Sequence, residues 1–150
     1  MRQSMMVFST KLALLALVVL LAAPAAFASP PTLEGSWRTT STLDGATEST
    51  PGLFTFAKGG TLIASNNTDT TGNGHGTWKR LAGRTFAATN IAFVYDSNGV
   101  ATQIFETEIT FRVSWSGNTF RATFETSVQT LDGTVLATAS GTATGERIGD

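Results

Sequence analysis

The sequence predicts an all-β protein, an eight-stranded antiparallel up-and-down barrel that is preceded by a signal peptide. Three observations predict this class. Apolar and polar residues alternate with a period of two along much of the chain after residue 28. Clusters of glycine, asparagine and aspartate interrupt the alternation at short intervals, as hairpin turns do. No segment with helical periodicity of useful length follows residue 28.

The first residues have the three parts of a secretory signal peptide. A basic start is followed by an apolar run over residues 12–23 and by the small residues Ala26 and Ala28. A membrane-spanning helix needs about 20 apolar residues, and this run is shorter. We therefore expect a signal peptide over 1–28, a single barrel domain over 29–150, and a secreted or periplasmic protein without stable membrane insertion after cleavage.

Composition excludes several classes of function. The chain has 10 basic and 11 acidic residues, and the first 28 residues hold two of the basic ones. The remaining domain is acidic and has no run of basic residues, so nucleic acid is not an expected partner. It has no cysteine and a single histidine, so neither disulfides, nor a metal site, nor any other cofactor is expected.

Eight strands follow from the alternation, and each break between them carries a glycine or asparagine that suits a tight turn. Such short connections join antiparallel neighbours, so the strands form a meander. Closing the meander removes both open edges, and the long later strands favour a barrel over the alternative, a two-sheet sandwich. The expected strands are residues 33–43, 52–57, 61–66, 74–81, 85–95, 101–115, 119–130 and 134–148.

The sixth and seventh strands indicate which side chains face inward, because carboxylates are rarely buried without a partner. The outward set includes Glu108 and Arg112 on one strand and Arg121 and Glu125 on the next, and we expect opposite charges to pair across them. The inward set is Phe105, Thr107, Ile109, Phe111, Val113, Trp115, Phe120, Ala122, Phe124, Thr126 and Val128.

Two other strands leave alternatives open. Strand 85–95 is apolar on both faces, which suggests either a covering partner, including a second copy of the chain, or a β-bulge that shifts the register. Strand 134–148 presents small residues on one face. They either pack tightly against aromatic rings or leave a cavity.

Gly35, Ser36 and Trp37, at the start of the first strand, resemble the opening motif of lipocalin-type (calycin) barrels. The resemblance implies that Trp37 closes the barrel floor and that Arg147, near the end of the chain, packs across the indole. The chain departs from that family because it lacks a helix after the barrel and a disulfide, and because its barrel is shorter. Residues 74–79 are also similar to a segment of small uncharacterised secreted bacterial proteins, a likeness that implies no activity.

The preferred functional hypothesis is the binding of a small hydrophobic molecule inside the barrel, because apolar pockets with a few polar anchors hold such ligands. We expect the ligand to contact Trp78, Asn90, Phe93, Tyr95, Phe105, Thr107, Ile109, Phe111, Phe120 and Phe124. The same side chains could instead fill a solid core.

Two other classes of function remain as alternatives. One is a barrel cyclase or isomerase acting on an apolar substrate, with His75, Tyr95 and Asn90 as its polar groups. No nucleophile and base can be paired around His75 from the sequence, so a histidine at the barrel rim is the preferred interpretation and no catalytic residue is predicted. The other is a structural or interaction protein with a filled core.

Overall fold

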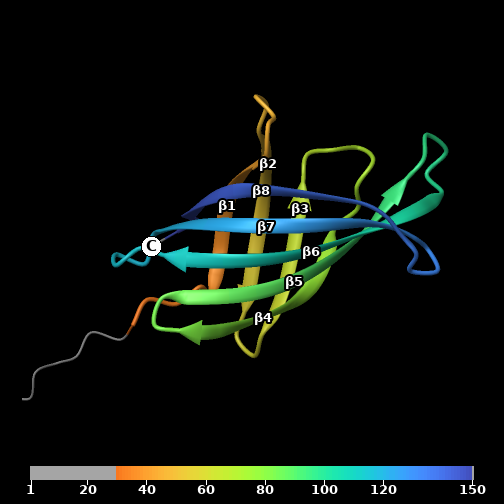
Figure 1. The fold of residues 1–150 in the computed structure, drawn as a ribbon. Helices are drawn as coiled ribbons and strands as arrows, with labels where there is room; N and C mark the ends of the chain where they lie inside the picture. The colour runs from red at the N-terminus through yellow and green to blue at the C-terminus, as the bar shows by residue number, and fades with distance from the viewer. Residues whose placement is uncertain (1–29, 150) are drawn as a thin grey trace, which may run out of the picture.

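The computed structural model describes residues 30–149, so the signal peptide predicted over 1–28 lies outside the described residues. These residues form a closed barrel of eight antiparallel strands, in which each strand pairs with the next and the last pairs with the first (Figure 1). The predicted meander and its closure are confirmed. Within residues 30–149, no helix is long and apolar enough to cross a bilayer.

The strand bounds lie within two residues of the predicted ones. Alternation placed them well because the inward positions are apolar and the turns use residues that tolerate unusual backbone angles. Gly83, between the fourth and fifth strands, has a positive φ of 51° that favours glycine. The strands are β1 (Gly35–Leu43), β2 (Thr50–Ala57), β3 (Thr61–Asn66), β4 (Gly74–Ala82), β5 (Thr85–Tyr95), β6 (Ala101–Val113), β7 (Thr119–Thr130) and β8 (Val135–Arg147).

The barrel has two different ends. One, which we call the closed end, holds the start of β1, the end of β8 and the β2–β3, β4–β5 and β6–β7 turns. The other, the open end, holds the other four connections. Figure 1 shows the long strands β5–β8 crossing β1–β3 steeply and continuing beyond them at the open end. The inner face of β5–β8 is therefore longer than the strands that could cover it.

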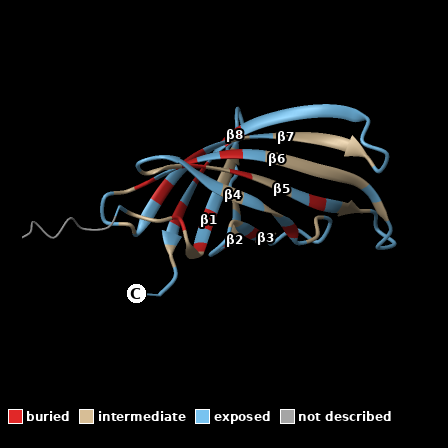
Figure 2. Cartoon of the chain, turned by 90° about the horizontal axis from the view of Figure 1, so that it is seen from below, coloured by how far each residue is buried: buried red, intermediate tan, exposed pale blue. Residues whose placement is uncertain are grey.

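Aromatic rings fill the closed half of the barrel. Trp37, Phe56, Phe86 and Phe111 are fully buried, and Phe120 nearly so. The Phe111 ring lies edge-on to its neighbours, with centroids 5.2 Å from that of Phe56 and 5.0 Å from that of Phe120, a favourable arrangement for aromatic pairs. Figure 2 shows buried segments on several strands, most of them gathered toward one part of the barrel.

The small residues of β8 pack against rings of β7. Gly145 lies opposite Phe120 and Gly141 lies opposite Phe124, and each ring occupies the space that a Cβ atom on its glycine would need. The sequence left two alternatives for these small residues, tight packing against aromatic rings or a cavity. At Gly141 and Gly145 the structure shows tight packing.

Trp115 departs from the predicted register. Strand β6 ends at Val113, and Trp115 lies in the following turn with 80% of its surface exposed. The guanidinium carbon of Arg84 lies 3.8 Å from the centroid of its indole. The strand stops early because Ser114 starts the β6–β7 turn, where Gly117 N–H donates to its carbonyl over 3.1 Å.

The predicted pairing of opposite charges between β6 and β7 is wrong. Arg112 lies directly opposite Arg121, and Glu108 lies directly opposite Glu125. The pairs Phe111–Ala122 and Ile109–Phe124 fix this register from the inside of the barrel. Burial of those inward side chains outweighs the modest cost of like charges that face each other in water.

Candidate functional site

The closed end is sealed by Trp37 and Arg147. The guanidinium carbon of Arg147 lies 4.2 Å from the centroid of the Trp37 ring, and the indole N–H donates to the carbonyl of Leu33 over 2.8 Å. The Arg147 guanidinium also donates to the carbonyls of Thr32, Glu34 and Gly117, over 2.6 to 2.9 Å. Burial lowers the pKa of Arg147, and an arginine stays protonated even so. No ligand can enter through this end without breaking these contacts.

Five of the ten predicted ligand-contacting residues belong to the filled core next to this floor. Ile109, Phe111 and Phe120 are buried in it, and Trp78 and Phe124 pack against it while partly buried. The Trp78 indole N–H donates to the carbonyl of Ala57 over 3.0 Å. Their burial within the aromatic cluster assigns these residues a packing role.

Phe93 and Tyr95 do not face the barrel interior, and this part of the prediction is wrong. Phe93 is 47% exposed, whereas its neighbour Ala92 is buried. The Tyr95 ring lies against Gly72. The segment Thr70–Gly72 pairs with the end of β5, since Gly72 N–H donates to the carbonyl of Phe93 over 2.9 Å and Tyr95 N–H to that of Thr70 over 2.7 Å. Both faces of β5 are apolar, so its sequence could not indicate which face is inside.

The other three predicted residues lie on the inner face of β5–β8, between the core and the open end. Asn90 lies opposite Thr107, and Ala92 lies opposite Phe105. Strands β7 and β8 continue these two rows. The open-end site, as we call it, consists of Asn90, Ala92, Phe105, Thr107, Thr126, Val128, Ala137 and Ala139.

The open-end site is apolar and partly uncovered. Phe105 and Val128 are half-buried, and Ala137 and Ala139 are exposed although they continue the inward rows of β8. The long strands β5–β8 continue past β1–β3 toward this end of the barrel (Figure 1). An apolar inner face that the chain itself does not cover can be covered by an apolar molecule, with a gain of about 25 cal/mol for each Å² removed from water.

Polar groups lie at the boundary between this site and the core. The hydroxyls of Thr107 and Thr126 are 2.9 Å apart and bond to each other. The Asn90 carboxamide lies over Gly74, and within residues 30–149 its Oδ1 is a shielded atom that has no hydrogen-bond partner. A buried acceptor without a donor is costly, so a molecule that brings an O–H or N–H group to Asn90 would remove this cost.

The rim of the open end is also apolar. Large apolar side chains are exposed where the long strands finish and in the turns that connect them. Single exposed apolar residues are ordinary, but here several follow one edge of the molecule and adjoin the open-end site. They are Leu43, Val100, Leu131, Val135 and Leu136.

The fold does not bring together the three polar residues on which the cyclase or isomerase alternative depends. His75 is exposed on the outer face of β4, between Gly74 and Gly76. Tyr95 is also on the outer face, whereas Asn90 is on the inner face. Proton transfer needs groups within hydrogen-bond reach of one substrate, and the barrel wall separates Asn90 from His75 and Tyr95.

Five members of the open-end site were not among the predicted ligand-contacting residues: Ala92 on β5 and four residues of β7 and β8. The alternation of β7 predicts that Thr126 and Val128 face inward, and Ala137 and Ala139 belong to the face of β8 that carries small residues. Their exposure depends on how far β5–β8 extend beyond β1–β4, which no single strand reveals. The register between strands supplies that information.

Comparison with known proteins adds no assignment: the sequence matches no protein-family model and no curated protein.

Proposed function

We propose that the protein is an exported, lipocalin-like barrel that binds one small apolar molecule at its open-end site. The observation that carries this proposal is the uncovered apolar inner face of β5–β8, beside an aromatic core that already fills the closed half. The stacking of Arg147 on Trp37 and the eight-stranded closure support the likeness to lipocalins.

The polar groups of the site define the ligand further. Asn90 Oδ1 needs a donor, and the paired hydroxyls of Thr107 and Thr126 can each offer a further hydrogen bond. Since the site contains no charged side chain, a neutral molecule suits it better than an ion. The ligand class is therefore a neutral apolar molecule with one hydroxyl or amide donor, such as a long-chain alcohol.

The direct test is a fluorescence titration of the purified protein with a neutral fluorescent long-chain alcohol. We expect saturable binding with an emission shift toward shorter wavelength as the probe leaves water. The variant Phe105→Glu places a charge within the site, and we expect it to weaken binding at least about tenfold, because an unpaired buried carboxylate is strongly disfavoured.

The matched control is Ile104→Glu, which places the same charge one residue away on the outer face of β6. We expect this control to leave probe affinity within about twofold of the parent value. Absence of saturable binding, or equal losses in the two variants, would exclude the open-end site as the binding site.

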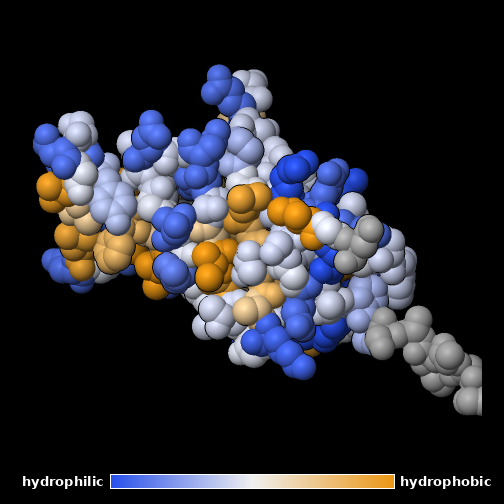
Figure 3. Space-filling model, turned by 180° about the vertical axis from the view of Figure 1, so that it is seen from behind, coloured by the Kyte–Doolittle hydropathy of each residue, from blue (hydrophilic) through white to orange (hydrophobic). Residues whose placement is uncertain are grey.

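A second candidate function is that of an interaction protein, and the outer face of the barrel favours it. Leu53, Ile63, Ile91 and Phe93 are each about half exposed, and Ile63 and Ile91 flank His75 in strand register. Figure 3 shows apolar residues in patches across this side of the molecule and at the end of the long strands. Sedimentation velocity tests this candidate. Self-association of the parent protein that is lost in the variant Phe93→Ser would support it. A parent protein that stays monomeric at all concentrations would oppose self-association through this face.

A further inference from the structure

The charges of the barrel are separated between its two ends. Every lysine and arginine of residues 30–149 lies in a closed-end turn or within a few residues of that end of a strand. All four open-end connections carry carboxylates instead: Asp44 and Glu48, Asp69, Asp96 and Asp132. Hydrogen bonds from the backbone of Val100 and Asn98 lower the pKa of Asp96, which keeps it charged at neutral pH. The closed end holds eight basic residues against the carboxylates Glu34 and Glu146, and it is thus an electropositive surface on a protein whose net charge is negative.

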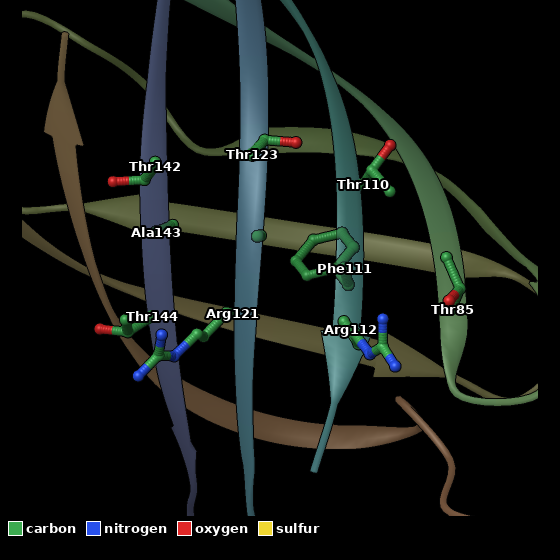
Figure 4. A pocket seen from close by; sticks show the side chains of 10 residues that line it. Thr85, Thr110, Phe111, Arg112, Arg121, Thr123, Thr142, Ala143 and Thr144 are labelled. Atoms are coloured by element: carbon green, nitrogen blue, oxygen red, sulfur yellow. The ribbon is translucent and has the colours of Figure 1, made fainter.

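A groove of about 570 Å³ crosses the outer face of the sheet near this closed end. Two rows of side chains that face outward, each running across neighbouring strands, line it (Figure 4). One row is Thr85, Arg112, Arg121 and Thr144, and the other is Thr110, Thr123 and Thr142.

Arg112 and Arg121 form a pair of like charges on the outer face of the sheet. They are exposed and directly opposite each other on β6 and β7, where Cβ atoms are about 5 Å apart and like charges destabilise. In the register of residues 30–149, their other direct neighbours are Thr85 and Thr144, and neither is a carboxylate. Figure 4 shows the two guanidinium groups pointing away from each other, Arg112 on the side of Thr85 and Arg121 on the side of Thr144.

Other arginines of the closed end already have structural partners. Arg147 lies over Trp37, Arg84 over Trp115, and Arg80 over the Phe86 ring at 4.5 Å from its centroid. Arg80 also donates to the carbonyl of Pro31 over 3.0 Å, and Arg84 to that of Val113 over 2.6 Å. Arg112 and Arg121 differ from these three because they line a groove and extend over it from two adjacent strands.

We propose that this groove is a binding site for an oxyanion, specifically a phosphate group. Rotation of these exposed side chains would turn both guanidinium groups toward a phosphate held between them, which would neutralise the repelling pair and accept paired N–H bonds from each guanidinium. Thr85 and Thr144 supply hydroxyl donors on either side, and the threonine row supplies more. The electropositive end would attract anions toward the groove. The phosphate can belong to a free anion or to the headgroup of an anionic lipid, since the chemistry is the same.

The test is calorimetric titration of the purified protein with inorganic phosphate at low ionic strength. In parallel, the protein is sedimented with phosphatidylcholine vesicles made with and without phosphatidylglycerol. We expect binding in at least one of these assays, and the one that responds identifies the source of the phosphate. Arg112→Gln and Arg121→Gln should each weaken that binding at least about tenfold, because each removes charge-assisted hydrogen bonds.

The matched control is Arg38→Gln, which removes an exposed arginine that is opposite Glu146 and outside the groove. It should leave affinity within about twofold of the parent value. In buffer without phosphate, both groove variants should melt at or above the temperature of the parent, since each relieves the repulsion. Binding of neither phosphate nor anionic vesicles would overturn the proposal, as would unchanged binding by Arg112→Gln combined with Arg121→Gln.

Discussion

Arg147 shows how much a single residue contributes to the closed end. Its guanidinium stacks on Trp37 and donates to three carbonyls, two of which belong to the segment before β1. The carbonyls of Thr32 and Glu34 lie outside the hydrogen-bonded pairing of β1 with β2, which begins at Gly35. One side chain therefore joins the two ends of the described chain and covers the floor of the core.

We predict that Arg147→Met lowers the free energy of unfolding by about 2 to 4 kcal/mol, because hydrogen bonds from a charged donor contribute about 1.5 to 3 kcal/mol each and only part of their sum survives partial exposure. Methionine keeps the apolar contact with the indole, so the loss of stability measures the contribution of the guanidinium group. Urea unfolding measures it, with Arg38→Met on the outer face of β1 as the control. Equal midpoints for the two variants would show that Arg147 does not hold the floor together.

The resemblance to lipocalin-type barrels implied Trp37 and Arg147 as partners, whereas the alternation of the sequence misplaced Phe93, Tyr95 and Trp115. Trp37 and Arg147 lie at opposite ends of the strand order, so closure alone brings them together. Phe93 and Tyr95 lie on a strand whose two faces are equally apolar. Trp115 follows a long alternating run whose end is set by a turn, and aromatic character alone does not distinguish a strand residue from a turn residue.

At the scale of elements, glycine sets how closely β4 approaches its neighbour. Gly74 lies beneath the Asn90 carboxamide, and a Cβ atom at Gly76 would overlap the carbonyl of Thr89 on β5. The backbone of β5 has no flexible end that could move aside. The glycines beside His75 thus allow the close packing of β4 against β5.

We predict that Gly76→Ala destabilises the protein by about 2 kcal/mol or more, since added atoms in a tightly packed position cost about 1 to 3 kcal/mol and here the obstacle is backbone. Thr77→Ala, at an exposed position of the same strand, should change stability by less than about 0.5 kcal/mol. Thermal unfolding of the two variants compares these values. A stable Gly76→Ala protein would mean that β4 and β5 lie farther apart than the structure places them.

Strand positions could be predicted because each strand carries its own alternation, and turn residues mark where it stops. How neighbouring strands are placed relative to one another could not be predicted. The Arg112–Arg121 pair, and the length by which β5–β8 pass β1–β4, both depend on the stagger of neighbouring strands. That stagger results from packing of the whole aromatic core. For the same reason, part of the open-end site and all of the outer groove were missed.

At the scale of the whole molecule, the barrel combines a filled half and an uncovered half. The closed half contains the aromatic core, the floor contacts and the basic residues. The open half contains the apolar inner face, the apolar rim and the acidic turns. A neutral apolar ligand and a phosphate would therefore bind at different places, one inside and one outside, without competing for a side chain.

The most direct test of the open-end site is solution NMR of the protein with a neutral long-chain alcohol. Binding inside the long strands predicts intermolecular nuclear Overhauser effects from the alkyl chain to the methyl groups of Val128 and Ala137. It also predicts a shift of the Asn90 side-chain amide that the matching alkane does not produce. Contacts confined to outer-face methyls such as those of Ile63 and Ile91, or no contacts at saturating alcohol, would contradict it.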